Sequence, residues 1–234
     1  MFTATTRASR LPAAAPIVLG VALLTSAFTV AFQGHRGAAG TAPLRGATAV
    51  AQPSVCKGYK TYGVPKVAPL NTRKTYKAVV TTNKGAFTIT FYPKQAPVTV
   101  ESFVFLAQRR YFDGVVFHRV VPTFVIQGGD PTGTGECGPG YQFGTENTGG
   151  AYYRGTVAMA RTNDPHSNGS QFFVVLQDNG PLNQEPNYSI FGKVTSGMNV
   201  VDRIASVRLG PGSDGTNSSP LTKIYMKSVR ITVS

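Results

Sequence analysis

The chain has 234 residues, a formal net charge of +13, 26 glycines and no tryptophan, and only 14% of its residues are charged. This length allows one or two domains and is ample for a hydrophobic core. The composition excludes a coiled coil and an acidic disordered chain, and it indicates a loop-rich globular domain with an appended tail.

The positive charge is concentrated in the N-terminal part of the chain. No Asp or Glu precedes Glu101, and residues 1–100 hold 12 Lys or Arg, whereas the remainder holds 11 basic and 10 acidic residues. A nucleic-acid-binding surface would need base-stacking aromatics among the basic residues or a recognisable motif, and neither is evident. We therefore expect no nucleic-acid partner, because a basic segment beside anionic lipid headgroups explains the charge more simply.

The first predicted element is an apolar helix over Leu11–Phe32, 22 residues without a charged side chain. About 20 apolar residues span a bilayer as a helix. The preceding Arg7 and Arg10 also suit a secretory signal, but the candidate cleavage site, Ala49-Val50-Ala51, lies far beyond the apolar run. We favour an uncleaved membrane anchor over residues 1–32, with cleaved secretion as the alternative. Either one places the C-terminal domain on the extracytoplasmic side.

Residues 33–75 are rich in Gly, Ala, Pro and Thr, show no helical or strand period, and are predicted to form a linker. The globular domain is predicted over residues 76–234. It begins with a β-hairpin, because Tyr76–Thr82 and Ala86–Tyr92 are β-prone runs that flank a short turn containing Gly85.

Two helices are expected further along the chain. Pro97 suits the first turn of a helix that ends at the basic pair Arg109-Arg110, and a second helix is expected over Gly197–Val207. Most of the remaining sequence consists of short β-prone runs cut by glycines, and it ends in a predicted strand over Tyr225–Val233. Many short strands with two helices indicate a mainly β domain, either a closed barrel or a sandwich.

The segment Phe117–Gly135 reads FHRVVPTFVIQGGDPTGTG and combines a guanidinium, an aromatic ring and an amide, on Arg119, Phe124 and Gln127. In a regular strand from Pro122 onward, Phe124 and Gln127 would point to opposite faces. We therefore expect a bend or irregular backbone here. A ligand would meet a fixed cation, an apolar wall and an amide, with no obvious nucleophile.

This segment resembles the signature of the cyclophilin family of peptidyl-prolyl isomerases, in which FHR, a proline, a phenylalanine and QGGD recur in this order. Gly155–Ala160 (GTVAMA), Asn168–Phe173 (NGSQFF) and Phe191–Val194 (FGKV) also match the family in order and spacing. The resemblance implies a closed eight-stranded antiparallel β-barrel capped by two α-helices. Tyr188 replaces the common histidine of the pocket rim, a change that is similar to bacterial exported or membrane-anchored members.

The resemblance also implies roles for individual residues. Arg119 would draw electron density from the twisted prolyl amide, Gln127 would hydrogen-bond substrate and arginine, and Phe124 would complete the catalytic set. The implied proline pocket and peptide groove consist of Val125, Ala160, Arg161, Gln171, Phe173, Leu182 and Tyr188. Isomerisation requires no covalent intermediate, so no cofactor is expected.

Other interpretations remain open beside these. From composition alone Phe124, Val125 and Phe173 are more readily core residues, and only the motif favours a pocket. His118 is interpreted as structural because isomerisation moves no proton, and no Cys/His set has metal-ligand spacing. The leading hypothesis is a monomeric isomerase that acts on proline-containing, unfolded or partly folded exported polypeptides. The alternative is a proline-peptide-binding module or chaperone with little turnover.

The only two cysteines, Cys56 and Cys137, are expected to form a disulfide. An exported domain meets an oxidising compartment, where paired thiols cross-link. Cys137 stands where the family usually has a small residue, and Cys56 lies in the appended segment, which suggests that they are partners. Two unpaired thiols are the alternative.

Overall fold

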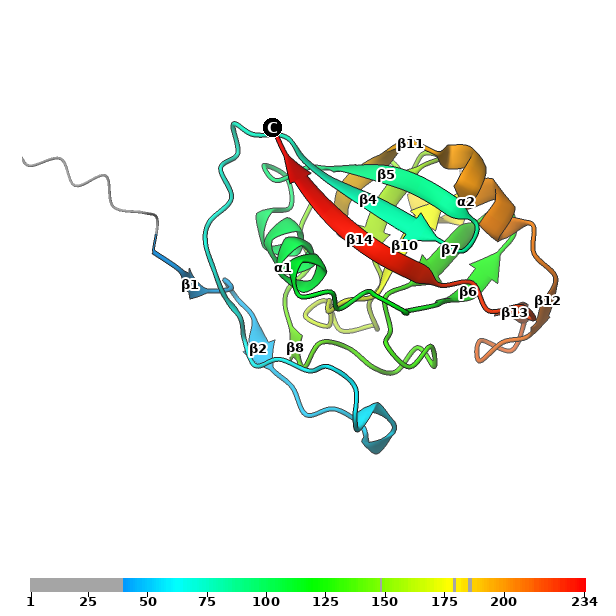
Figure 1. Ribbon diagram of the computed structural model, residues 1–234, viewed down its shortest axis with the longest axis horizontal. Coiled ribbons are helices and arrows are strands. Elements are labelled where there is room, and N and C mark those ends of the chain that lie inside the picture. Colours follow the sequence, from blue (N-terminus) through cyan, green and yellow to red (C-terminus); the bar gives the residue numbers. More distant parts are fainter. Residues whose placement is uncertain (1–39, 148, 179, 185–186) are drawn as a thin grey trace, which may run out of the picture. The chain divides into compact units, whose positions relative to one another are not determined.

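A computed structural model describes residues 40–147, 149–178, 180–184 and 187–234. Its centre is an eight-stranded antiparallel sheet in the order β14-β4-β5-β11-β9-β10-β7-β6, which curls around a hydrophobic interior (Figure 1). The strands of this sheet are β4 (Tyr76–Thr82), β5 (Gly85–Phe91), β6 (Phe117–Val121), β7 (Val125–Gly128), β9 (Thr156–Met159), β10 (Phe172–Val175), β11 (Ile190–Ser196) and β14 (Met226–Val233).

The predicted hairpin at the start of the domain is confirmed. Strands β4 and β5 pair antiparallel across a turn that closes between Thr82 and Gly85. Phe87, Ile89 and Phe91 are buried, whereas the threonines between them are only partly buried. This alternation is that of a strand with one face on the core, as the sequence pattern indicates.

The expectation of a closed barrel is wrong. Among the described residues, the edge strands β14 and β6 share no ladder, and the segments just before them meet at one corner through an isolated bridge between Val116 and Tyr225. Beyond that corner, β6 lies against the hairpin formed by β12 (Leu209–Pro211) and β13 (Asn217–Pro220). The sheet is therefore a curled half-barrel: the hairpin, and not β14, lies beside the short edge strand β6.

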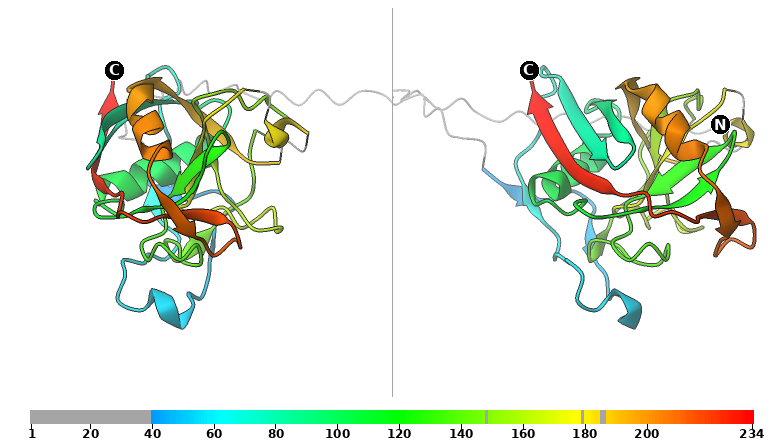
Figure 2. Two further views of the ribbon diagram at one scale, coloured as in Figure 1. Left: turned by 90° about the vertical axis from the view of Figure 1, so that its right-hand side faces the viewer. Right: turned by 45° about the vertical axis from the view of Figure 1, so that its right-hand side comes forward.

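Both expected helices are confirmed, with slightly different ends. Helix α1 (Pro97–Gln108) stops where the pair Arg109-Arg110 begins. Helix α2 (Met198–Ala205) is shorter than expected because Gly197 adopts a left-handed conformation with a φ of 79° and Ser206 leaves the helical conformation. The two helices lie at opposite ends of the curled sheet (Figures 1 and 2).

Two apolar clusters occupy the two sides of the central strands. Ile126, Phe172 and Val174 point into the main cluster in the interior of the half-barrel. Their neighbours along the strands point the other way, because successive side chains alternate in direction. Together with residues of other segments they form a smaller cluster of buried residues on the outer face: Val125, Tyr152, Ala158, Phe173, Val175, Leu182 and Ile190.

Residues 40–75 differ from the predicted linker. Strands β1 (Ala42–Pro43) and β3 (Lys66–Val67) pair with each other, and β2 (Thr48–Ala49) pairs with β8 (Tyr141–Gln142). Leu44 is buried in the main cluster. Figure 2 shows how the part that carries the 3-10 turn η1 (Ser54–Cys56) extends beyond the body of the sheet. Elements of two or three residues are too short to produce a periodic signal, which is why the pattern missed them.

No helix within the described ranges is long and apolar enough to cross a bilayer. The predicted apolar helix over Leu11–Phe32 lies outside the described residues. So does the beginning of the predicted linker, residues 33–39.

Candidate active site

The signature segment bends where the sequence predicts an irregular backbone. Strand β6 ends at Val121 and β7 begins at Val125. Between them Thr123 has a φ of 64°, and the N–H of Phe124 donates to the carbonyl of Val121 at 3.0 Å. This turn allows Phe124 and its neighbour Val125 to line the same cavity as Gln127. The predicted bend is confirmed.

A β-bulge determines the direction of Arg119. Phe117 lies opposite Gly128 and Arg119 lies opposite Gln127, so β6 contains one extra residue, His118, within this pair. A bulge of this kind shifts the alternation of side chains. Phe117 is therefore buried in the interior, whereas Arg119 lines the outer-face cavity beside Gln127.

The predicted site residues gather around a cavity of about 100 Å³ on the outer face. All the catalytic and substrate-binding residues implied by the resemblance, except Gln171, line it. Gln171 lies at a neighbouring cavity of about 170 Å³, which shares three of its lining residues with the first. The nine lining residues of the first cavity are Arg119, Phe124, Val125, Gln127, Ala160, Arg161, Phe173, Leu182 and Tyr188.

The floor of this cavity is apolar and its rim is held by hydrogen bonds. Val125, Phe173 and Leu182 are 2%, 5% and 9% exposed. The hydroxyl of Tyr152 donates to the carbonyl of Tyr188 at 2.8 Å and accepts from the N–H of the same residue at 2.9 Å. The cavity is thus a pocket with a buried apolar floor, and hydrogen bonds hold the backbone of its rim residue Tyr188 in place.

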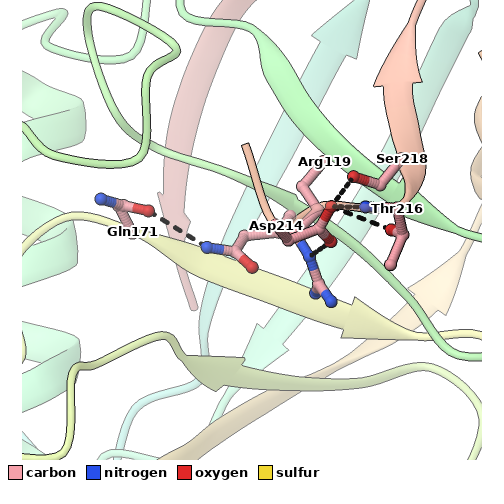
Figure 3. Close-up of polar contacts among 6 residues, drawn as sticks. Arg119, Gln171, Asp214, Thr216 and Ser218 are labelled. Carbon is pink, nitrogen blue, oxygen red and sulfur yellow. Dashed lines mark hydrogen bonds and ion pairs between the residues drawn. The ribbon is translucent and has the colours of Figure 1, made fainter. Parts of the chain in front are cut away.

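Two glutamines form a directed chain beside the pocket. Gln127 donates through Nε2 to Oε1 of Gln171 at 3.1 Å, and Gln171 donates through Nε2 to the carbonyl of Gly135 at 2.7 Å. This arrangement fixes both amide orientations. The expected bond between Gln127 and Arg119 is not among the hydrogen bonds of the described residues. Nε of Arg119 donates to Asp214 instead (Figure 3).

Electrostatically, the pocket is bordered by two guanidinium groups. Arg161 donates through Nε to the carbonyl of Asn187 at 2.8 Å, and its Cζ lies 5.4 Å from the ring centroid of Tyr188. Burial lowers the pKa of His118, so this histidine favours its neutral form; the charge of Asp130 opposes the shift and that of Arg119 adds to it. Among the described residues there is no cluster of His, Cys, Asp or Glu that could hold a metal ion.

The segment before the sheet contributes to the neighbouring cavity. Cys56 is joined to Cys137, with a Cα–Cα distance of 5.7 Å. Gln52 accepts a hydrogen bond from the N–H of Gly138 at 3.0 Å, and both Gln52 and Cys137 line the cavity that holds Gln171. The sequence identified the cysteine pair, but nothing in it pointed to Gln52.

Comparisons with known proteins point to one family. A family model described as cyclophilin type peptidyl-prolyl cis-trans isomerase/CLD matches residues 77–231. Peptidyl-prolyl cis-trans isomerase-like 1 of Aspergillus fumigatus is 41% identical over 134 residues, which cover 56% of this chain and 82% of the relative. The protein of the same name from Gibberella zeae is 39% identical over 161 residues, 67% of this chain and 95% of the relative.

A solved structure supports the same relationship. The crystal structure of a Cryptosporidium parvum cyclophilin type peptidyl-prolyl cis-trans isomerase superposes with a TM-score of 0.62 at 30% identity, over 68% of this chain and 98% of that one. A second structure of that protein, in the presence of the dipeptide Ala-Pro, gives a TM-score of 0.61. The two curated relatives are fungal, so the expected resemblance to bacterial members finds no support in them.

Proposed function

This chain belongs to the cyclophilin family of peptidyl-prolyl cis-trans isomerases, and from that membership we propose that its outer-face pocket isomerises X–Pro bonds in unfolded or partly folded polypeptides. The observation that carries the proposal is the convergence of a guanidinium, an amide and an apolar floor on one cavity of about 100 Å³. A small pocket with an apolar floor suits a proline ring, and polar groups at its border suit the flanking peptide.

The chemistry requires only a change of shape. Rotation about the bond faces a barrier of about 18–20 kcal/mol because amide resonance is lost in the twisted state. The prolyl nitrogen then regains a lone pair that can accept a hydrogen bond, so a donor beside it stabilises the twisted state more than either planar one. Arg119 is the group in this role. Its guanidinium is partly shielded from water, with 30% of the side chain exposed, which strengthens its electrostatic effect.

The remaining residues hold the substrate. Phe173, Val125 and Leu182 receive the proline ring, and Phe124 bounds the pocket beside Arg119. Gln127 has its Nε2 occupied by Gln171, which leaves its Oε1 to accept a hydrogen bond from the peptide. Ala160, Arg161 and Gln171 lie along the path between the two cavities, where an extended peptide backbone would run.

A proline-peptide-binding module with little turnover is the alternative. It needs the same apolar floor and amides, but it has no use for a guanidinium fixed at the pocket. The experiment that tests the proposal compares the wild-type protein with Arg119→Ala in a protease-coupled assay on a short X–Pro peptide. NMR exchange spectroscopy on the same peptide supplies a rate without protease. Binding of the peptide without acceleration of its isomerisation would favour the module.

We also propose an extracytoplasmic location, so that the clients are exported polypeptides. Leu11–Phe32 would direct the protein to the membrane and remain as its anchor. Support comes from the length of this uncharged run and from the bond between Cys56 and Cys137, because disulfides persist in oxidising compartments. Without a catalyst, X–Pro isomerisation of such clients takes tens of seconds or more.

A further inference from the structure

The hairpin of β12 and β13 carries an acidic residue to the pocket. Its turn runs over residues 212–216, where the N–H of Gly212 donates to the carbonyl of Thr216 at 2.7 Å. A Cβ atom at Gly212 would collide with Oγ of Ser218 and crowd the carboxylate of Asp214, so a side chain there would disturb the contact between those two residues. Because β13 lies against β6, this turn brings Asp214 beside Arg119, which is 95 residues away in the sequence.

The two oxygens of Asp214 have separate partners (Figure 3). Oδ1 accepts hydrogen bonds from the N–H and the hydroxyl of Thr216, at 3.1 and 2.9 Å, and from the hydroxyl of Ser218 at 2.6 Å. Oδ2 accepts from Nε of Arg119 at 2.7 Å. Because three donors of its own hairpin fix Oδ1, the direction of Oδ2 toward Arg119 is set before any substrate arrives.

This contact constrains the guanidinium in a particular way. A guanidinium is planar, so a hydrogen bond from Nε restrains the direction of the Nε–H bond and with it the direction in which Nη1 and Nη2 project. The terminal Nη1 and Nη2 make no hydrogen bond within the part of the chain that the structure describes, although they carry the donors that reach furthest from the backbone. The carboxylate thus holds the inner nitrogen and leaves the outer ones for the substrate.

We propose that Asp214 is a positioning residue for the isomerisation: it acts through Nε of Arg119 and orients the two Nη groups toward the prolyl bond. The inference rests on the proposed function and adds to it a residue that only a Gly-Ser-Asp-Gly turn marks in the sequence. The carboxylate of Asp214 remains ionised at neutral pH, because the hydrogen bonds that it accepts lower its pKa. The bond from Ser218 has the largest effect and the bond from Arg119 the next largest.

An ordinary surface ion pair elsewhere in the protein provides the comparison. Arg154 binds both oxygens of Asp202 through the single nitrogen Nη2, at 2.7 Å each, and its side chain and that of Asp202 are 41% and 47% exposed. Neither residue lines the two cavities that hold the predicted site residues. Asp202→Ala is therefore a matched control, since it also removes an aspartate carboxylate that binds an arginine at a similar distance.

The experiment measures kcat and KM for an X–Pro peptide in Asp214→Ala, Asp214→Asn and Asp202→Ala. Asp214→Ala is expected to lower kcat/KM by about tenfold, mainly through kcat. The Arg119 guanidinium would no longer be directed at the twisted prolyl bond, whereas the apolar pocket that binds the proline ring would stay intact. Asp214→Asn keeps an oxygen acceptor for Nε and is expected to recover part of the loss. Asp202→Ala is expected to match the wild-type protein.

A second measurement separates positioning from a structural role. In an Arg119→Ala background, Asp214→Ala is expected to lower kcat/KM no further, because the carboxylate acts through the guanidinium. Solvent exchange of the Arg119 Nε–H proton, followed by NMR, should accelerate in Asp214→Ala and stay unchanged in Asp202→Ala. A further loss of activity in the Arg119→Ala background would instead indicate that the hairpin itself is damaged, and it would overturn the inference.

The outcomes also separate this inference from the proposed function. An active wild-type protein with an unaffected Asp214→Ala variant contradicts the role of Asp214 alone and leaves the isomerase assignment standing. A correctly folded wild-type protein that binds X–Pro peptides without accelerating their isomerisation contradicts both.

Discussion

The ring of Tyr188 stands perpendicular to the ring of Phe173, with the centroids 5.3 Å apart. An edge-to-face pair of this kind contributes about 0.5–1.5 kcal/mol beyond the area that it buries. Because the backbone of Tyr188 is also tied to the hydroxyl of Tyr152, the pair forms a wall of fixed position on one side of the pocket.

The first prediction concerns this wall. Phe173→Leu keeps an apolar side chain but removes the flat ring, so the dissociation constant for an X–Pro peptide should rise by about fivefold to tenfold. Titration calorimetry measures the change. Tyr153→Ala is the control, since Tyr153 is 52% exposed and does not line the pocket. Equal affinity of the Phe173→Leu and wild-type proteins would place the proline ring elsewhere.

The second prediction concerns the cation. Arg119→Ala should lower kcat/KM by at least about tenfold, equivalent to roughly 1.4 kcal/mol of transition-state stabilisation. The melting temperature should change little, because ion pairs that remain in contact with water contribute about 0–1 kcal/mol, and the side chains of Arg119 and Asp214 are only partly shielded, at 30% and 24% exposed. Arg119→Lys keeps the charge without the fork of donors and should also be slow. A variant within twofold of the wild-type rate would exclude the proposed mechanism.

The third prediction is a stability that depends on pH. Burial lowers the pKa of His118 below its ordinary value of about 6.5, and its Nδ1 has no hydrogen-bond partner among the described residues. The unfolded chain therefore takes up a proton at higher pH than the folded one. The contribution to the free energy of unfolding is complete above about pH 6.5 and is lost as the pH falls through the folded-state pKa.

Urea denaturation at a series of pH values measures this effect. His118→Gln should flatten that part of the curve, and His166→Gln, at an exposed loop position, should leave it unchanged. The value of kcat/KM should stay constant wherever the protein is folded, since rotation of the amide transfers no proton. A steep rate profile shared by the wild-type protein and His118→Gln would argue for a titrating group in the reaction.

The fourth prediction concerns the bond between Cys56 and Cys137. Its sequence separation of 81 residues corresponds to roughly 4–5 kcal/mol of stabilisation on the chain-entropy model, which is an upper figure. The double variant Cys56→Ser/Cys137→Ser should therefore melt at a lower temperature, and reductant should lower the melting temperature of the wild-type protein alone. A thiol titration of denatured, non-reduced protein should find no free thiol. Two reactive thiols per chain would show that the bond is absent.

The fifth prediction concerns location. If Leu11–Phe32 remains as an anchor, the protein should sediment with membranes and resist extraction by alkaline carbonate. Protease added from the extracytoplasmic face should digest residues 76–234. A soluble protein with a new N-terminus near Gln52 would show cleaved secretion instead.

The sequence predicted the elements that repeat a pattern over several residues. The β4–β5 hairpin and the two helices were accessible for this reason, because periods of 2 and 3.6 residues require several residues to become visible. The paired dipeptide strands before residue 70 carry no such signal, and Leu44 is a single apolar residue in a Gly- and Ala-rich stretch. The open seam between β14 and β6 depends on the hairpin beside β6, which no local pattern could reveal.

The site divides in the same way. The residues around the pocket were predictable because the family signature places them at fixed distances in the sequence. Asp214 and Gln52 were not, since each is brought to the site by packing of a distant segment. Asp214 contacts Arg119 from the hairpin beside β6, and Gln52 lines the neighbouring cavity from the stretch next to Cys56.

The bond between Cys56 and Cys137 also determines how mechanical load passes through the molecule. If the chain is pulled at residues before Cys56 while its C-terminus is held, the tension passes through the two sulfur atoms to Cys137 and bypasses the residues between them. Strands β4 to β7 and helix α1 all lie within that covalent loop. The two strands that carry Arg119 and Gln127 are therefore outside the covalent load path, whereas the pocket residues that follow Cys137, such as Phe173 and Tyr188, remain on it.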